Sequence, residues 1–523
     1  MTAKVLMIQG TGSSVGKSIL VAALCRIFRQ DGFSVAPYKS QNMSLNSYVT
    51  RDGGEMGRAQ VVQAEAAGIE PSVDMNPILL KPEADARSQV VLMGKPWKTV
   101  PAGEYYLQTT ELLKAAEESL NRLRSQYDIV VIEGAGSPAE INLKRREIVN
   151  MRIAKMADAP VLLVGDIDKG GVFAQLVGTL ALLDEDEKRY VKGFIINKFR
   201  GDVSLLKPGL DELEGITSLP VVGVVPYYHD IFIDEEDSVR RDTPENTSTD
   251  IDITVVHFPH ISNSTDFEPL QCEQGVTVRY IRHVKDIGHP DLIILPGSKS
   301  TISDLERIKN TGIADDIVRS ANSGVPIIGI CGGFQMLGRR IKDPYHTESE
   351  HNSIEGLGLL DVVTTFAKRK TTWQVRAVCN SKRGILGDIR GEIISGYEIH
   401  MGRTLADNVS PAFRITQRGE RRSNHLDGAT NGDGSIVGTY IHGLFENESI
   451  RRCLLSNLRR AKGVDGDTRT FTLSKGSEYD KLADHVRNSL DMDMVYKIAG
   501  INRPSKQRCR KLPARGTGGV PQI

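Results

Sequence analysis

The feature that most limits the fold of this chain is an apolar run that ends abruptly at a cysteine. Residues 326–330 read Pro-Ile-Ile-Gly-Ile, Cys331 follows, and Gly332 and Gly333 open a helical pattern. This order is typical of an elbow between a strand and a helix, which lifts the cysteine out of the sheet. A helix N-terminus favours negative charge and therefore the thiolate. Most lone cysteines are core residues, but a core cysteine needs no elbow, so we predict that Cys331 is a nucleophile.

The first 233 residues alternate between short apolar runs and helical patterns. The apolar runs predict strands at Val5–Ile8, Ser34–Tyr38, Asp128–Ile132, Pro160–Val164, Val191–Asn197 and Pro220–Val225. These runs are almost continuously apolar, as strands buried on both faces of a parallel sheet are. The helical segments between them supply crossover connections, so this part is predicted to be a doubly wound α/β domain.

A second α/β pattern begins at residue 251, after a segment that reads as a linker. Residues 234–250 are acidic and then rich in Pro, Asn, Ser and Thr. Residues 504–523 are basic and rich in Gly and Pro, and we expect a disordered tail there. The second doubly wound domain, with a C-terminal helical extension, is predicted at 251–503, with strands at Ile251–Phe258, Asp291–Leu295, Val325–Ile330 and Ser435–Ile441.

The composition excludes several kinds of partner. The chain has 66 basic and 66 acidic residues, so we expect neither nucleic acid nor an anionic membrane surface as its main partner. The 6 cysteines include no C-x-x-C pair, which argues against a zinc site or a disulfide framework and favours the cytoplasm. Polar Gln9 and Gly10 leave the first apolar run too short for a signal peptide, and we expect no membrane span because no apolar stretch is long enough to cross a bilayer.

A glycine-rich loop follows the first predicted strand and precedes the helical run Ile19–Gln30. Glycines let backbone N–H groups surround phosphate oxygens, and the helix N-terminus adds its dipole. Lys17 would reach the terminal phosphates, and Ser18 would bind Mg²⁺. The leading glycine lies one residue further out than in the standard phosphate loop. In this respect the loop resembles the longer loop of dethiobiotin synthetases. The predicted nucleotide-binding residues are Gly10, Thr11, Gly12, Gly16, Lys17 and Ser18.

Three more residues at strand ends fit a nucleotide enzyme. Glu133 ends the strand Asp128–Ile132, at the sheet edge where α/β proteins bind ligands, and is a candidate Mg²⁺ ligand. Asn197 could read the nucleotide base, and Lys39 could meet the γ-phosphate or an acyl phosphate. The alternatives are that Glu133 is a solvated carboxylate at a strand end, that Asn197 caps a turn and that Lys39 is a surface lysine.

A cysteine nucleophile needs a base, and a late histidine is placed to supply one. His442 ends the run Gly438-Thr-Tyr-Ile and is followed by Gly443. Another strand ends at Leu295-Pro-Gly297, where backbone N–H groups could form an oxyanion hole with that of Gly332. We therefore predict Cys331 and His442 as the catalytic pair and Gly297 and Gly332 as the oxyanion donors.

This half of the chain resembles the class I glutamine amidotransferase domain. The resemblance rests on the elbow at Gly329–Gly333, the turn at Leu295–Gly297 and the late histidine. The family commonly places a glutamate two residues after the histidine, but position 444 is leucine and Glu446 is displaced. The resemblance therefore implies a Cys-His dyad.

The whole chain except the basic tail resembles the cobyric acid synthase family. The matching segments are Tyr38–Ser47, Glu55–Gln60, Met75–Pro82, Glu133–Leu143 and Gly396–Gly402. The resemblance implies a P-loop NTPase-like domain of dethiobiotin-synthetase type joined to a glutaminase domain. It also implies ATP, Mg²⁺ and L-glutamine, and a small-molecule corrinoid substrate whose b, d, e and g carboxylates are amidated. A homo-oligomer is compatible with the sequence.

The predicted corrinoid-binding residues are Lys39, Gln41, Asn42 and Gln60. Amide groups suit a substrate that bears many carboxylates and amides, although a solvated helix face would explain Gln60 and Arg58 equally well. Glu398 and His400 would line either the glutaminase site or the domain interface, or serve the structure only.

Two other readings stay open from the sequence. One is a related amidoligase, either cobyrinic acid a,c-diamide synthase or a cell-wall lipid amidotransferase. The other is a ParA-like ATPase switch with an inactive glutaminase-like module, which the long phosphate loop allows.

Overall fold

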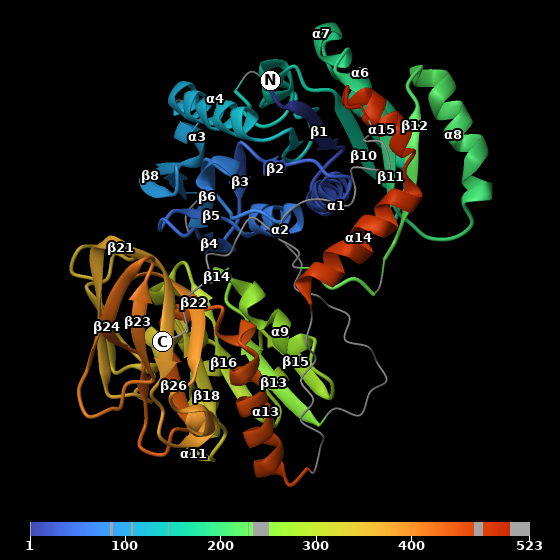
Figure 1. The fold of residues 1–523 in the computed structure, drawn as a ribbon. Coiled ribbons are helices and arrows are strands. Elements are labelled where there is room, and N and C mark those ends of the chain that lie inside the picture. Colours follow the sequence, from blue (N-terminus) through green and yellow to red (C-terminus); the bar gives the residue numbers. More distant parts are fainter. Residues whose placement is uncertain are drawn as a thin grey trace, which may run out of the picture.

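The computed structural model of the 523-residue chain describes residues 2–83, 87–105, 108–144, 146–228, 230–233, 250–464 and 474–502. They form two α/β domains, drawn one above the other in Figure 1. Residues 234–249 of the predicted linker and the whole of the predicted tail lie outside the described residues.

A parallel six-stranded sheet forms the centre of the N-terminal domain and confirms the predicted strands. Its order is β12-β11-β10-β1-β9-β2. The strands are β1 (Lys4–Gly10), β2 (Val35–Tyr38), β9 (Ile129–Glu133), β10 (Val161–Asp166), β11 (Val191–Phe199) and β12 (Val221–Pro226). Alternate side chains of β1 enter two cores, because Leu6 and Ile8 pack on one face and Val5 and Met7 on the other. The chain is doubly wound, as predicted.

Helices cover both faces of this sheet. Helix α1 lies on the face of Leu6 and Ile8, and α4 to α6 and α8 lie on the other face. Their bounds are α1 (Lys17–Gln30), α2 (Arg58–Ala67), α3 (Ala102–Tyr105), α4 (Thr109–Gln126), α5 (Met151–Ala157), α6 (Val172–Ala181), α7 (Glu185–Lys188) and α8 (Val203–Thr217).

Short strands between β2 and α4, which the sequence did not predict, form two small sheets. One has the order β3-β6-β7-β8, and the other is the hairpin of β4 and β5. The strands are β3 (Gln41–Met43), β4 (Ser47–Val49), β5 (Glu55–Gly57), β6 (Ile78–Glu83), β7 (Arg87–Leu92) and β8 (Lys95–Pro101). The hairpin brings this segment to the domain interface (Figure 1).

The C-terminal domain has a sheet of order β15-β13-β16-β18-β26-β25, parallel except for β25. The strands are β13 (Ile251–Val256), β15 (Val276–Ile281), β16 (Leu292–Leu295), β18 (Ile327–Ile330), β25 (Ala429–Thr430) and β26 (Ile436–Thr439). β13, β16 and β18 confirm three predicted strands, whereas the predicted strand Ser435–Ile441 ends at Thr439 as β26, and Ile441 belongs to a strand of another sheet. The helices are α9 (Glu268–Gln271), α10 (Thr301–Asn310), α11 (Ile313–Asn322), α12 (Gly332–Leu337) and α13 (Glu448–Lys462).

A second, seven-stranded sheet of this domain was not predicted from the sequence. It contains β19 (Arg340–Lys342), β20 (Ser353–Glu355), β21 (Val362–Cys379), β22 (Ile393–Ala406), β23 (Phe413–Arg418), β24 (Arg421–Asp427) and β27 (Ile441–His442). The pair β21–β22 is antiparallel and carries β27 on its edge, with Tyr397 opposite His442. The sheet therefore sets the position of the predicted catalytic histidine.

Ion pairs join the two domains, and the one between Glu55 and Lys370 is buried. The fully buried carboxylate of Glu55 lies 2.7 Å from Lys81 Nζ in its own domain and 2.6 Å from Lys370 Nζ on β21. Arg58 also pairs with Glu446, at 3.0 Å. A buried charge is tolerated only when it is paired, so these contacts favour one arrangement of the domains.

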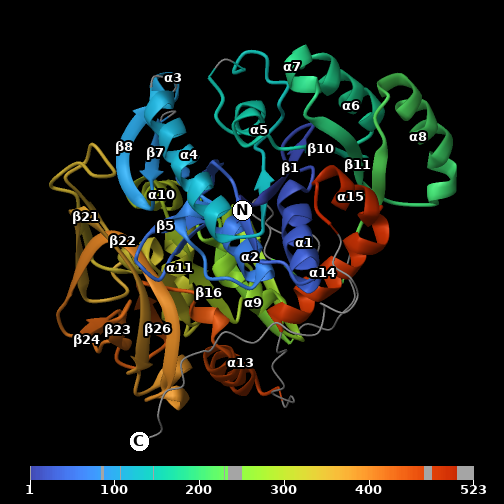
Figure 2. The ribbon, with the colours of Figure 1, turned by 45° about the horizontal axis from the view of Figure 1, so that its top comes forward.

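The last two helices, α14 (Lys475–Ser489) and α15 (Met492–Ile498), follow the C-terminal domain in the chain but pack on the N-terminal domain. Leu482 and Val486 share a core with α1, and Arg26 Nε lies 2.7 Å from Asp480 Oδ1. Figures 1 and 2 both show these helices beside α1. The N-terminal domain is therefore completed by the far end of the chain.

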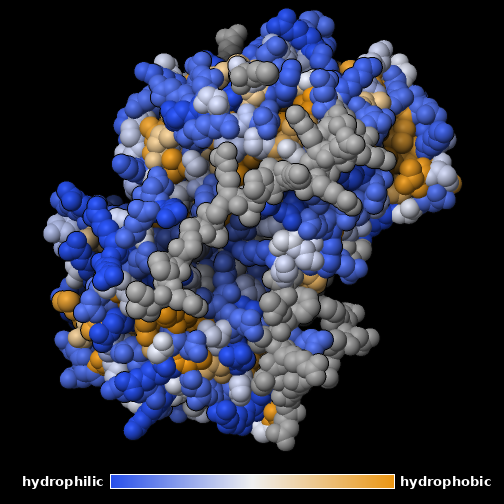
Figure 3. All heavy atoms as spheres, viewed as in Figure 1, coloured by the Kyte–Doolittle hydropathy of each residue, from blue (hydrophilic) through white to orange (hydrophobic). Residues whose placement is uncertain are grey.

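The face drawn in Figure 3 is largely hydrophilic. Apolar side chains gather over α8, where Val203, Leu205 and Ile216 are exposed. Across the described ranges, no helix has both the length and the apolar character needed to cross a bilayer.

We predict that Leu482→Ala destabilises the N-terminal domain selectively. Truncating this buried side chain leaves a cavity against α1, which costs about 2–5 kcal/mol of the free energy of unfolding. Hydrogen exchange should accelerate at the amides of α1 and remain unchanged in β18. Asp484→Ala, on the exposed face of α14, is the matched control. Equal exchange in α1 of the two variants would contradict this packing role.

Candidate active site

The predicted elbow is present, and Cys331 lies at its tip. Cys331 has φ 52° and ψ −106°, a backbone conformation that L residues rarely adopt, and α12 starts at the next residue. Its N–H donates to Thr439 O at 2.8 Å, which anchors the turn to the end of β26. A Cβ on Gly333 would lie 2.0 Å from Leu295 O, so only glycine lets α12 approach β16 this closely.

His442 lies close enough to Cys331 for the two side chains to interact, and the structure adds a carboxylate behind the imidazole. His442 Nδ1 lies 2.7 Å from Asp266 Oδ2, and Gly443 N donates to the other oxygen of Asp266 at 2.9 Å. Asp266 lies on the short helix η3 (Ser264–Phe267). Because Nδ1 is engaged, Nε2 is the nitrogen available to the thiol, and it has no conventional hydrogen-bond partner within the described part of the chain.

The electrostatics of this triad favour a charged imidazole. Burial by itself lowers the pKa of His442, but the Asp266 carboxylate and then the Cys331 thiol outweigh it and raise the pKa to about 10. His442 therefore carries a proton at neutral pH and can act as the counterion of a Cys331 thiolate.

The dyad expected from the sequence is therefore a triad whose acid is neither residue 444 nor Glu446. The Glu446 carboxylate instead pairs with Arg58 and, at 3.7 Å, with Lys475. Sequence reasoning missed Asp266 because it precedes the cysteine, whereas the family resemblance places the acid after the histidine. The only local signal was a polar turn, Asn263-Ser-Thr-Asp266, after the first strand of the domain.

Gly297 and Gly332 both border the Cys331–His442 site. Gly297 is in β17 (Gly297–Ser298), and a Cβ there would lie 3.1 Å from His442 Cε1. A Cβ on Gly332 would lie 2.8 Å from Ser298 N. Both glycines lie close to the catalytic pair, and their role as oxyanion donors stays a prediction.

A polar wall lies beside the thiol. Cys331 Sγ lies 3.7 Å from Ile399 O on β22, and the next residue, His400, stacks on Tyr440 with ring centroids 3.8 Å apart. Gln335 Nε2 donates to the Tyr440 hydroxyl at 3.3 Å. The Glu398 carboxylate forms a bidentate ion pair with Arg418, with N–O distances of 2.7 and 2.8 Å, and this pair joins β22 to β23.

In the N-terminal domain, the predicted phosphate loop links β1 to α1. Gly16 has φ 95°, and Lys17 Nζ donates to Gly12 O at 2.7 Å and Gly136 O at 3.2 Å. The Lys17 side chain thus lies across the loop and is buried. Thr11 Oγ1 donates to Gln175 Oε1 at 3.1 Å, and Gly10 and Gly12 complete the loop.

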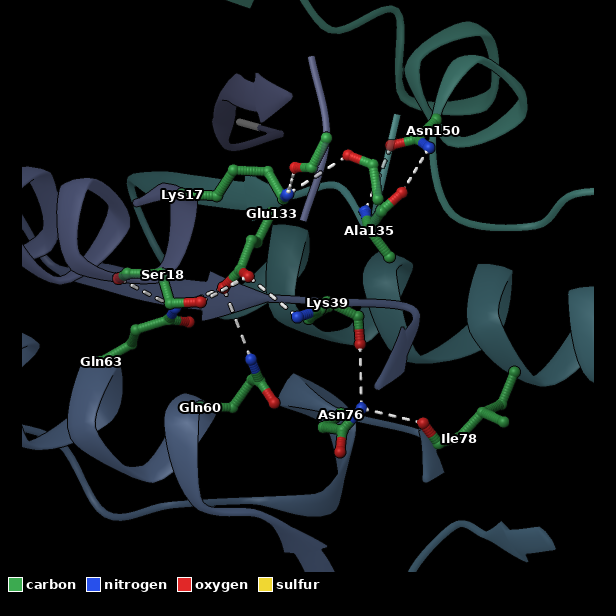
Figure 4. A network of polar contacts seen from close by, with 12 residues as sticks. Lys17, Ser18, Lys39, Gln60, Gln63, Asn76, Ile78, Glu133, Ala135 and Asn150 are labelled. Carbon is green, nitrogen blue, oxygen red and sulfur yellow. Dashed lines mark hydrogen bonds and ion pairs between the residues drawn. The ribbon is translucent and has the colours of Figure 1, made fainter. Parts of the chain in front are cut away.

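Glu133 is the centre of a polar network beside this loop, shown in Figure 4. Its fully buried carboxylate accepts from Ser18 Oγ at 2.8 Å, Lys39 Nζ at 2.8 Å and Gln63 Nε2 at 2.5 Å. Burial by itself raises the pKa of Glu133, but the Lys39 ammonium and these hydrogen bonds outweigh it and hold the pKa below its usual value. Glu133 is therefore an anion at neutral pH.

Lys39 and Gln60 also belong to this network, whereas the other predicted corrinoid residues lie on β3. Gln60 Nε2 donates to Glu133 Oε2 at 3.5 Å. Gln41 Oε1 accepts from the Tyr105 hydroxyl, and Asn42 is buried near Gly57. The structure brings Lys39 and Gln60 to the phosphate loop, and corrinoid binding by all four residues stays a prediction.

Asn197 packs directly on the phosphate loop. Its Nδ2 donates to Val15 O at 2.9 Å, and a Cβ on Gly16 would lie 2.1 Å from the same nitrogen. Asn197 therefore holds the loop conformation, and the predicted contact with the nucleotide base stays untested.

The residues predicted to bind Mg²⁺ supply two oxygen atoms that could act as metal ligands. Ser18 Oγ and Glu133 Oε1 lie 2.8 Å apart beside the phosphate loop, and such oxygens suit Mg²⁺. No cluster of three or more His, Cys, Asp or Glu side chains suited to a metal occurs in the part of the chain that the structure describes. An ion here would take its remaining ligands from water and nucleotide phosphates.

Comparison with known proteins gives a consistent assignment for both domains. Residues 6–239 match the CobQ/CobB/MinD/ParA nucleotide binding domain, and residues 252–450 match the CobB/CobQ-like glutamine amidotransferase domain.

Similar full-length proteins share one description. A protein of Dehalococcoides mccartyi (strain CBDB1), called cobyric acid synthase, is 56% identical over 498 residues, covering 95% of this chain and 99% of its own. Proteins with the same description from Sorangium cellulosum (strain So ce56) and Pelotomaculum thermopropionicum are 52% and 48% identical. The alignments cover 96% and 99% of this chain and all of both relatives.

We predict that Asp266→Asn changes the pH dependence of Cys331 alkylation by iodoacetamide. Without the carboxylate, the pKa of His442 falls, the imidazole loses its charge at neutral pH and the thiolate loses its counterion. The pH of half-maximal alkylation should therefore rise by about one unit or more, as measured by mass spectrometry of the Cys331 peptide. Glu446→Gln is the comparison, and an equal rise in both variants would refute the assignment of Asp266.

Proposed function

The chain belongs to the cobyric acid synthase family, and from this premise we propose that it amidates the b, d, e and g carboxylates of adenosylcobyrinic acid a,c-diamide. Glutamine supplies the nitrogen, ATP activates each carboxylate, and the product is adenosylcobyric acid. The chain is a glutamine-dependent, ATP-dependent amidoligase of cobalamin biosynthesis.

The C-terminal domain releases ammonia. The Cys331 thiolate attacks the carboxamide carbon of glutamine and forms a C–S bond, while N–H groups at Gly297 and Gly332 stabilise the oxyanion. The His442 imidazolium gives its Nε2 proton to the leaving nitrogen, so the C–N bond breaks. Water then gives a proton to the neutral His442 imidazole as it hydrolyses the thioester to glutamate, which restores the thiolate and the imidazolium. The raised pKa of His442 supports this assignment, because the proton is already in place.

The N-terminal domain prepares the acceptor. A carboxylate is a poor electrophile until the γ-phosphoryl group of ATP is transferred to it with release of ADP. Ammonia then attacks the acyl carbon, and phosphate leaves. The cations of Lys17 and Lys39 lie beside the loop and would neutralise the charge of the transferring group.

Mg²⁺ fits this assignment as a cofactor. Ser18 and Glu133 would hold it, and when bound it would neutralise charge on the nucleotide phosphates. Glu133 suits this role because it stays ionised despite full burial.

The observation that carries the proposal is that one chain holds a site suited to each half-reaction. Asp266 and His442 form a buried pair beside a strained cysteine, and the half-buried Ser18 bonds the buried carboxylate of Glu133 beside the phosphate loop. Ammonia released by one is the nucleophile that the other requires.

The remaining readings are disfavoured by particular observations. Similarity to cobyric acid synthases over almost the whole chain favours this reaction over a,c-diamide synthesis or cell-wall lipid amidation. A ParA-like switch with an inactive module gives no reason for the buried Asp266–His442 pair. A homo-oligomer, a cytoplasmic location and the lack of a nucleic-acid partner stay predictions.

We predict that Cys331→Ser separates the two half-reactions. Glutamine-dependent amidation should fall by about 10³-fold or more, because the thiolate is lost. Amidation with ammonium salts should persist, because the phosphate loop is untouched. Mass spectrometry of the corrinoid, after incubation with ATP, Mg²⁺ and either nitrogen source, gives both rates. Loss of both activities would contradict the assignment of Cys331.

Lys17→Met should give the reciprocal result. Removing the cation that lies across the loop should abolish amidation from either nitrogen source, while the purified variant still releases glutamate from glutamine. The corrinoid assay measures the first activity and a glutamate assay the second. Amidation at the wild-type rate would refute the role of the loop.

A further inference from the structure

The β4–β5 hairpin of the ATP domain lies against the glutaminase domain. Gln374 Nε2 on β21 donates to the Tyr48 hydroxyl at 2.7 Å and to Val49 O at 2.9 Å. Thr372 Oγ1 on the same strand donates to Gly53 O at 2.9 Å. Backbone and side chain of the hairpin are therefore both engaged by the neighbouring domain.

Asn46, just before this hairpin, and Asn263, just before η3 of the glutaminase domain, make reciprocal contacts across the interface. Asn263 Oδ1 accepts from Ser47 N at 2.9 Å, and Asn46 Oδ1 accepts from Ser264 N at 2.9 Å. Asn46 is 8% exposed and Asn263 is 1% exposed, so water competes little for these bonds. We call these two contacts the asparagine clasp.

The clasp holds the turn that carries the acid of the triad. Asn263 has φ 55° and ψ 46° and starts the helix η3. Asp266 N donates to Asn263 O at 3.0 Å, so the turn closes directly onto the clasped residue. The Asp266 carboxylate then reaches His442. Displacement of this turn by about an ångström would spoil the 2.7 Å bond to Nδ1.

Asn46 is itself held in place by the ATP domain. Its N–H donates to Ser44 Oγ at 3.0 Å, and its carbonyl accepts from Arg58 N, at the start of α2, at 3.1 Å. The acceptor that holds Ser264 is therefore part of a fixed loop, as a positioning group must be.

The same hairpin also supports the His442 imidazole through Tyr397. The rings of Tyr397 and His442 stack with centroids 5.4 Å apart and planes 17° apart. Tyr48 of the hairpin packs on Tyr397 with centroids 5.5 Å apart. One face of His442 is thus covered by a side chain that the ATP domain supports.

We propose that Asn46, a residue of the ATP domain, is a positioning residue of the glutaminase. Through the clasp it holds η3, and through η3 it keeps Asp266 against His442. The segment Tyr38–Ser47, which holds the predicted corrinoid-binding residues Lys39, Gln41 and Asn42, therefore ends in a contact that serves the other active site. This inference rests on the proposed glutaminase activity.

The test compares Asn46 variants in the full-length enzyme. Asn46→Ala should lower kcat for glutamine hydrolysis by about 10- to 100-fold, with a smaller effect on KM, and should raise the pH of half-maximal Cys331 alkylation. Amidation with ammonium salts should be retained. Asn46→Asp keeps an acceptor for Ser264 N and should restore most of the rate. If the alanine variant does not fold, Asn46→Leu removes the acceptor while keeping the side chain's size.

A double variant separates positioning from general weakening of the interface. In an Asp266→Asn background, Asn46→Ala should have little further effect, because the group that it positions is already disabled. Arg51→Ala is the matched control, since Arg51 forms an exposed interdomain pair with Glu420 at 3.1 Å, with side chains 68% and 76% exposed. It should leave hydrolysis and alkylation unchanged.

Three results would overturn the inference. They are an unchanged kcat in Asn46→Ala, an equal loss in the Arg51→Ala control, and an additive loss in the double variant. A wild-type enzyme that does not hydrolyse glutamine would instead refute the proposed function, so the two failures are distinguishable.

Discussion

A carboxylate removed from water must be matched by cations or hydrogen-bond donors, and this constraint organises the interior of the protein. Glu133 satisfies it beside the phosphate loop, Asp266 beside the thiol, and Glu55 between the domains with Lys81 and Lys370. Each carboxylate draws partners from elements far apart in the chain. The same contacts that make burial tolerable therefore fix the two sites and their relative position.

The parts of the fold that follow from local pattern were predictable. Continuous apolar runs predicted the parallel strands, because strands buried on both faces need no polar alternation. The glycine loop and the elbow at Cys331 were also visible, because a backbone that curls round a phosphate or turns sharply into a helix needs glycine at particular positions. Each of these signals is contained within a few neighbouring residues.

The rest depended on contacts that no local pattern records. Asp266 serves His442 from 176 positions away in sequence, and in the opposite order from the resembling family. The antiparallel sheet of β21 and β22 carries mixed polar and apolar residues, half-buried along much of its length, so it lacks the apolar runs that marked the parallel strands. Lys39 and Gln60 could be named from the sequence, but their joint attachment to Glu133 required the fold.

The return of α14 and α15 to the N-terminal domain affects the order of events during synthesis. The helix α1 is among the first segments to leave the ribosome, yet the apolar surface that Leu482 and Val486 cover stays open until nearly the whole chain has been translated. The C-terminal domain, whose described elements end at α13, has all its parts earlier. The domain that is translated first is therefore the last to be completed, and its unfinished face needs protection from aggregation in the meantime.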